Sequence, residues 1–110
     1  MAVQEMTPHR AGTQDATLKP CFKYTDTAGE WILIPAGVDT VTAIINATSG
    51  SSKLQATNDI VGVKAGTVTA VIDWDEGVIS STIAGMEVSN VLAVRQVISA
   101  GTATLYLSAK

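Results

Sequence analysis

Apolar and polar residues alternate over short stretches of this chain, and turns rich in glycine or proline separate the stretches. A phrase of threonines and β-branched residues follows a glycine three times, after Gly37, Gly66 and Gly101. Glycine allows the backbone geometry of a turn, and β-branched residues favour the extended conformation that follows it. The pattern predicts a turn and then a strand at residues 39–45, 67–72 and 102–107.

Further alternating or apolar stretches predict strands at residues 18–24, 31–34, 53–58, 78–81 and 91–99. In the last strand, Ala103, Leu105 and Leu107 should face inward. Hairpin turns are expected at residues 75–77 and 100–101, a turn at 46–52, and an irregular segment or single helical turn at 85–90. About seven or eight short antiparallel strands without a long helix indicate an all-β fold, a single-domain β-sandwich or flattened barrel.

The N-terminal stretch lacks both the helical and the strand period, and Pro8 and Gly12 interrupt it. We therefore expect residues 1–17 to form an extended N-terminal arm and residues 18–110 to form the β-sandwich domain. Such an arm is either a frayed terminus or a segment that a partner orders. In the second case Pro8, His9 and Arg10 are candidate contact residues.

Composition argues against several classes of function. Charged residues make up 15% of the chain, the net charge is −3, and the seven basic residues are scattered. This distribution is not the basic patch that nucleic-acid binding needs. The sequence contains no apolar run of signal-peptide or membrane-spanning length, so we expect a soluble protein with no membrane partner, made in a cytoplasm. Cys21 is the single cysteine, which excludes an intrachain disulfide and a thiolate metal cluster.

Candidate chemistry is sparse. His9, the one histidine, lies in the expected arm and makes a poor catalytic base for Cys21. Residues 73–77 place three carboxylates near a turn, but the spacing departs from a calcium loop, and a hydrolase built on Asp73 and Asp75 has no other polar group to support it. Trp31 and Trp74 are core residues by pattern, with a sugar-stacking platform as the alternative. We expect no enzyme activity, catalytic residue, metal or cofactor.

Some strands carry apolar residues on both faces. Ile44, Val71 and Val97 lie opposite the more apolar face of their strands. A single core would leave these three side chains outside it, and adjacent strands would merge them into a patch. We therefore expect homo-oligomerisation or docking through this second face.

Several phrases, in their order along the chain, resemble small virion proteins of tailed bacteriophages. The phrases are a strand closed by a proline-glycine turn, a strand ending in Asn-Asp, an Ala-Gly-Thr step, a tryptophan before an acidic-glycine turn, and a final Thr-Ala-Thr-Leu strand. They occupy residues 31–38, 53–59, 65–67, 74–78 and 99–105.

The resemblance implies an accessory structural component without enzyme activity or cofactor. Head decoration (cement) proteins of this kind are small all-β units that bridge subunits of the major capsid protein, often as trimers, on the outer surface of the head. They are made in the host cytoplasm and join the virion at assembly. A head-fibre or tail-associated protein, or a carbohydrate-binding module for host attachment, is the alternative that the sequence leaves open.

Overall fold

The computed structural model describes residues 4–10 and 20–109, and for residues 5, 7–10 and 20–23 it describes the backbone alone. The described residues contain nine strands of one hydrogen-bonded sheet and one short helix, joined by turns and loops. Their bounds are β1 Gln4–Glu5, β2 Thr7–Arg10, β3 Pro20–Asp26, β4 Ile32–Leu33, β5 Thr40–Thr57, α1 Ile60–Ala65, β6 Ile72–Asp73, β7 Ile79–Ser80, β8 Ile83–Ser89 and β9 Ala93–Ala109. The predicted all-β fold is confirmed.

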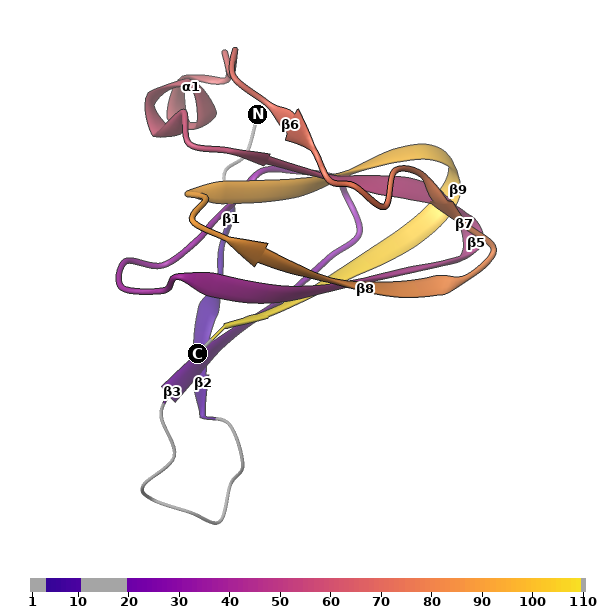
Figure 1. The fold of residues 1–110 in the computed structure, drawn as a ribbon, viewed down its shortest axis with the longest axis horizontal. Helices are drawn as coiled ribbons and strands as arrows, with labels where there is room; N and C mark the ends of the chain where they lie inside the picture. The colour runs from indigo at the N-terminus through magenta and orange to yellow at the C-terminus, as the bar shows by residue number, and fades with distance from the viewer. Residues whose placement is uncertain (1–3, 11–19, 110) are drawn as a thin grey trace.

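Two long strands organise the whole molecule. β5 and β9 pair antiparallel over nearly their full lengths, from Val41 opposite Ala109 to Thr57 opposite Ala93. Register shifts interrupt the pairing after Asn46 and after Ser51, so the two-stranded ribbon bends in its middle. Figure 1 shows the result: the ribbon folds back at the right of the view, and its two halves lie one above the other as two layers.

The bend explains a change in the side-chain pattern. Val41, Ala43 and Ile45 are buried before it, whereas Leu54 and Ala56 are buried after it. Side chains alternate strictly between the faces of a regular strand, so this switch from odd to even positions needs an extra residue, which the register shifts supply. β9 switches in the same way, and one face of the ribbon therefore stays inside along its whole length.

Short strands widen each layer on both sides of the ribbon. In the first layer, β8 pairs with the N-terminal half of β5, and β3 pairs with the C-terminal half of β9 and carries β2 at its outer edge. In the second layer, β6 and β7 pair with the rest of β5, while β4 pairs with β9 and carries β1. Thus β6, β7 and β8 follow one another along a single edge of β5.

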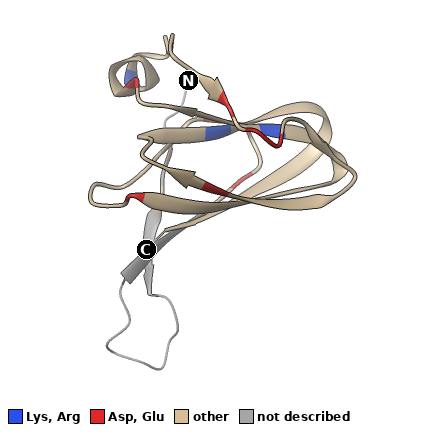
Figure 2. Ribbon diagram, in the orientation of Figure 1, with Lys and Arg blue, Asp and Glu red and all other residues tan. Residues whose placement is uncertain are grey.

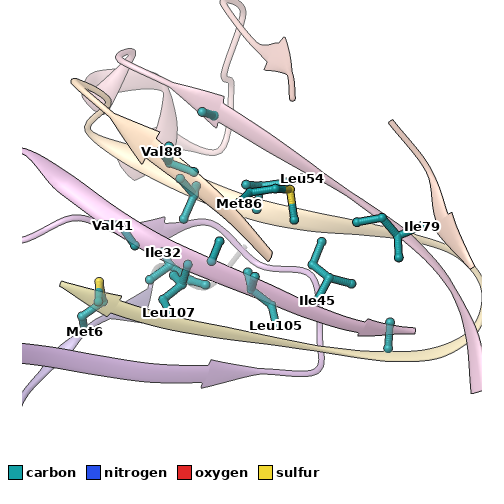
Figure 3. Packing of buried hydrophobic residues seen from close by; sticks show 14 of the residues in the cluster. Met6, Ile32, Val41, Ile45, Leu54, Ile79, Met86, Val88, Leu105 and Leu107 are labelled. Atoms are coloured by element: carbon teal, nitrogen blue, oxygen red, sulfur yellow. The ribbon is translucent and has the colours of Figure 1, made fainter. Parts of the chain in front are cut away.

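The main core fills the space between the layers. Its buried side chains come from both halves of the ribbon and from the strands beside it, and Figure 3 shows them converging from the facing sheets. Met6, between β1 and β2, is 4% exposed and belongs to this cluster. A smaller cluster of Trp31, Val63 and Ala93 lies on the other side of the second layer, under α1.

One polar side chain crosses the interior. Gln96 of β9 is fully buried, and its amide nitrogen donates to the carbonyl oxygens of Asp26 and Ala103, at 2.9 and 3.2 Å. Its amide oxygen accepts a 2.9 Å hydrogen bond from the Ser52 hydroxyl. Because Gln96 lies in the second layer and Ala103 at the start of the first, these bonds join the two halves of the folded ribbon.

Several expected elements differ from those in the structure. The hairpin expected at residues 100–101 and the turn expected at 46–52 are wrong, because both positions are bends inside continuous strands. The expected hairpin at residues 75–77 is also wrong: a turn exists there, but β6 and β7 both pair with β5. Residues 85–90 were expected to be irregular or a single helical turn, and instead they lie mostly in β8.

The threonine-rich phrase after Gly66 does not form the expected strand over residues 67–72. Gly66 ends helix α1 in a left-handed conformation, with φ of 78°. Backbone groups in the residues after Gly66 make hydrogen bonds that are not part of strand pairing. The amide of Thr67 donates to Gly62 O, and the carbonyl of Ala70 accepts from the Thr57 hydroxyl. These partners satisfy the segment without strand pairing, so the strand propensity of its threonines is overridden.

The N-terminal residues that the structure describes belong to the sheet. β1 pairs parallel with β4, and β2 pairs antiparallel with β3, with His9 opposite Cys21. The boundary expected between arm and domain, after residue 17, lies outside the described residues. No helix in the described part of the chain is long and apolar enough to cross a membrane.

Asp59 caps helix α1 and gives a pH-dependent prediction. The backbone amides of Gly62 and Thr69 donate to its carboxylate, which lowers the pKa of Asp59 below its ordinary value. A lowered folded-state pKa stabilises the protein above the unfolded pKa and loses that contribution as pH falls through the folded pKa. We expect part of the acid-side loss of stability to disappear in Asp59→Asn, measured by urea unfolding over a pH series. Equal acid dependence in both proteins would contradict the cap.

Candidate interaction surface

The outer face of the first layer, here called the first-layer outer face, is exposed across four strands. It consists of the residues that alternate with the core positions on four adjacent strands. Its described side chains, with Gly85, are Thr25 of β3, Thr40, Thr42, Ile44 and Asn46 of β5, Ile83, Gly85, Glu87 and Ser89 of β8, and Thr104, Tyr106 and Ser108 of β9.

The centre of this face is apolar. Ile44 lies between Gly85 on one side and Tyr106 on the other, in direct register. Ile44 is 40% exposed, Tyr106 41% and Ile83 60%. Removing large apolar side chains from water is favourable, so a group of them on a sheet face favours contact with another surface. Ile44 and Tyr106 therefore give the face an apolar centre, and Ile83 adds an exposed apolar side chain at its edge, at the start of β8.

The described side chains of this face carry little charge. Among the side chains that the structure describes there, Glu87 is the one charged group. Figure 2 shows the two long strands in tan through the first layer, with the basic residues of β5 and β9 confined to the second. A shallow hollow of about 260 Å³ lies beside Glu87, lined also by Thr40, Thr42, Ser108 and Ala109. The surface suits a neutral partner better than a charged one.

The outer face of the second layer has a different character. The Arg95 guanidinium lies 4.5 Å from the centre of the Trp31 ring and donates from Nε to the side chain of Gln55. Gln55 and Lys53 in turn donate to the two carboxylate oxygens of Asp73, at 2.7 and 3.1 Å. Burial lowers the pKa of Arg95, and the hydrogen bonds from Gln55 and Lys53 lower the pKa of Asp73. This face is a polar network with its partners already in place.

Neither tryptophan offers a free ring for sugar stacking. Trp31 is 1% exposed, which confirms the core position predicted from the pattern, and the Arg95 guanidinium covers its ring. Trp74 is half-buried and packs against the main core. An open apolar groove of about 300 Å³ does lie nearby, lined by Ala56, Thr57, Asn58, Ala70, Val71, Ile72 and Val91.

The acidic group expected at residues 73–77 is dispersed. Asp73 is bound by Gln55 and Lys53, while Asp75 and Glu76 lie exposed in the turn after it. Within the described residues, no group of three or more His, Cys, Asp or Glu side chains is placed to hold a metal ion.

The structure separates the residues expected to form one second face. Ile44 lies on the first-layer outer face, whereas Val97 lies half-buried on the second, opposite Lys53. Val71 packs against the Trp31 cluster. Pro8, His9 and Arg10 form β2 at the edge of the first layer, where the structure describes the backbone alone, so their role as contacts stays a prediction.

Sequence reasoning missed Ile83 as part of the exposed face. Residues 85–90 were expected to be irregular or a single helical turn, although Ala84, Met86 and Val88 alternate with Gly85, Glu87 and Ser89. That alternation is the signal that predicts β8 and fixes its inward and outward faces.

The chain was also compared with known proteins. No family model matches it, and no curated protein matches it.

Proposed function

We propose that this protein is a noncatalytic structural component of a tailed-phage particle, a decoration (cement) protein that stabilises the head by bridging subunits of the major capsid protein. The observation that carries the proposal is the first-layer outer face, which has one charge among its described side chains, an exposed apolar centre at Ile44 and Tyr106, and exposed Ile83 at its edge. The resemblance of five sequence phrases to small phage virion proteins supplies the class of partner.

The mechanism is adhesion across a seam. A face of this kind binds by removing apolar area from water, and with little charge its binding depends weakly on salt. When two capsid subunits separate, the area is exposed again, so the bound protein raises the free energy of opening the shell. The folded ribbon supports this role because the core behind the face holds it rigid.

Binding to bare heads tests the proposal. The protein is mixed with heads of the parent phage that lack it, the heads are sedimented, and the bound protein is quantified. We expect the wild type to sediment with the heads and to raise the temperature at which they open. Ile44→Lys places a charge at the centre of the face and should abolish binding, because an unpaired charge resists burial in an interface.

Val61→Lys is the matched control. Val61 is 80% exposed on α1, which lies on the opposite side of the molecule, and the same substitution there should leave binding unchanged. Circular dichroism and thermal unfolding establish that both variants fold. Failure of the wild type to bind heads, or equal binding by Ile44→Lys, would overturn the proposed function.

A further inference from the structure

Strand β8 has one edge that no other strand of the described chain covers. It pairs with β5 alone, from Asn46 opposite Ile83 to Thr40 opposite Ser89. Just beyond the ends of this ladder, the amide of Asn90 donates to Asp39 O at 3.0 Å and the amide of Ala47 donates to Thr82 O at 2.9 Å. Residues 82 and 90 therefore turn their backbone groups toward β5.

This phase fixes which groups face outward. Backbone N–H and C=O groups alternate in direction along an antiparallel strand, so the even-numbered residues between 82 and 90 also bond to β5. The odd-numbered residues direct their amides and carbonyls away from it. The groups at the free edge belong to Ile83, Gly85, Glu87 and Ser89.

The edge has one feature that usually prevents strands from pairing, the charged side chain of Glu87, and lacks the others. β8 contains no proline and no lysine, and its register with β5 runs without a bulge over seven residues. Its inward residues include Met86 and Val88, both buried. A regular edge with a single charged side chain is a template on which another strand can add.

We infer that β8 pairs antiparallel with β8 of a second copy of this chain, about a two-fold axis at Met86. In this register Gly85 lies opposite Glu87 of the second copy, and Ile83 lies opposite Ser89. The four outward-facing residues of each copy then form hydrogen-bonded pairs, which exchange about eight backbone hydrogen bonds. The contact is isologous, so it closes as a dimer.

Charge selects this register from its neighbours. A two-fold axis at Glu87 would place the two Glu87 carboxylates directly opposite each other, which is destabilising. An axis at Gly85 pairs fewer residues and places Ile83 opposite a carboxylate. With the axis at Met86, the glutamate meets a glycine, and a side chain at that position finds open space, since a Cβ built on Gly85 comes no closer than 3.9 Å to Ala43 O and Ile44 Cγ1.

The pairing extends the first-layer outer face. The two-fold axis of an antiparallel pair stands perpendicular to the sheet, so both copies present this face on the same side. The Glu87 stem of one copy lies over Gly85 of the other, next to Ile44, and reduces its exposure. The inference does not depend on the proposed capsid binding. It replaces the trimer that the resemblance implied with a dimer.

Sedimentation equilibrium combined with two variants tests the pairing. The wild type should show a mass twice that of the 11.4 kDa chain. Gly85→Glu sets two pairs of like charges opposite each other, whereas Gly85→Lys sets two pairs of opposite charges. We expect Gly85→Glu to weaken the dimer roughly tenfold and Gly85→Lys to strengthen it. Amide exchange at residues 83, 85, 87 and 89 should be slow in the dimer and fast in Gly85→Glu.

Each other outcome overturns the inference. A wild-type protein that sediments as a monomer would contradict the pairing. A trimer would mean that the copies associate through a different edge or face. Equal weakening by Glu and Lys would place residue 85 opposite itself, which rejects the Met86 axis. Thermal unfolding of both variants checks the fold, and head binding by a monomeric wild type would leave the proposed function standing while this inference fails.

Discussion

Replacing Gly50 with alanine should cost the protein at least about 3 kcal/mol of stability, because the added methyl group would clash with the backbone of the neighbouring strand. Gly50 of β5 lies opposite Gly101 of β9 at the bend of the ribbon. A Cβ on Gly50 would come within 2.3 Å of Ala100 O and 2.6 Å of Thr102 N. All of these are backbone atoms, so relief requires the two strands to separate where the layers join.

The expected effect is large against the total stability of such a domain, about 5–15 kcal/mol. Thermal unfolding should show a fall in Tm of more than about 10 °C. Gly101→Ala should behave similarly, since a Cβ there would lie 2.3 Å from Ser49 O and the residue has φ of 58°. Gly85→Ala is the matched control: its methyl group has open space, so this substitution should leave stability unchanged or raise it by up to about 1 kcal/mol. A Gly50→Ala protein as stable as the wild type would show that the strands are farther apart at the bend.

Gln96→Leu should also destabilise the fold strongly, by about 3–5 kcal/mol, although leucine is similar in size and more apolar. The substitution leaves the Ser52 hydroxyl and the carbonyls of Asp26 and Ala103 without their partner in the interior. Each buried polar group without a partner costs about 1–3 kcal/mol. Denaturant unfolding measures the loss as a lower midpoint with an unchanged slope.

Gln55→Leu is the control for this experiment. Gln55 also makes two side-chain hydrogen bonds, to Asp73 and from Arg95, but it lies on the outer face of the second layer, where water replaces lost partners. We expect Gln55→Leu to cost less than about 1 kcal/mol. Equal stability of Gln96→Leu and Gln55→Leu would mean that the hydrogen bonds of Gln96 do not hold the two layers together.

The alternation of side chains was predictable where strands are regular. It placed Ala103, Leu105 and Leu107 inside, and the structure buries all three. It could not distinguish a bend from a hairpin turn, because Gly101 has the same positive φ and lack of side chain that a tight turn would use. What distinguishes a bend from a hairpin turn is the partner strand. Gly101 pairs with Gly50, some fifty residues earlier in the sequence, and no local pattern predicts that pairing.

The candidate surface was predictable only in part. Strand period placed Ile44 and Tyr106 on the outward sides of their strands, but it grouped Ile44 with Val71 and Val97. Grouping depends on which layer each strand half occupies, and the bend assigns Ile44 and Val97 to opposite layers. Val71 lies in a segment whose backbone binds Thr57 and Asp59 instead of a neighbouring strand. Side-chain bonds of this kind override strand propensity without leaving a periodic signal.

The pairing of Val41 with Ala109 also constrains how the chain acquires its structure. The ladder that closes the first layer joins residues nearly seventy positions apart, and such distant contacts slow folding because a long loop must close before they form. During synthesis, β5 leaves the ribosome before its main partner, β9, has been made. Until β9 has left the ribosome, the edge and core face of β5 are open to wrong partners, so we expect the incomplete chain to need chaperones before β9 is available.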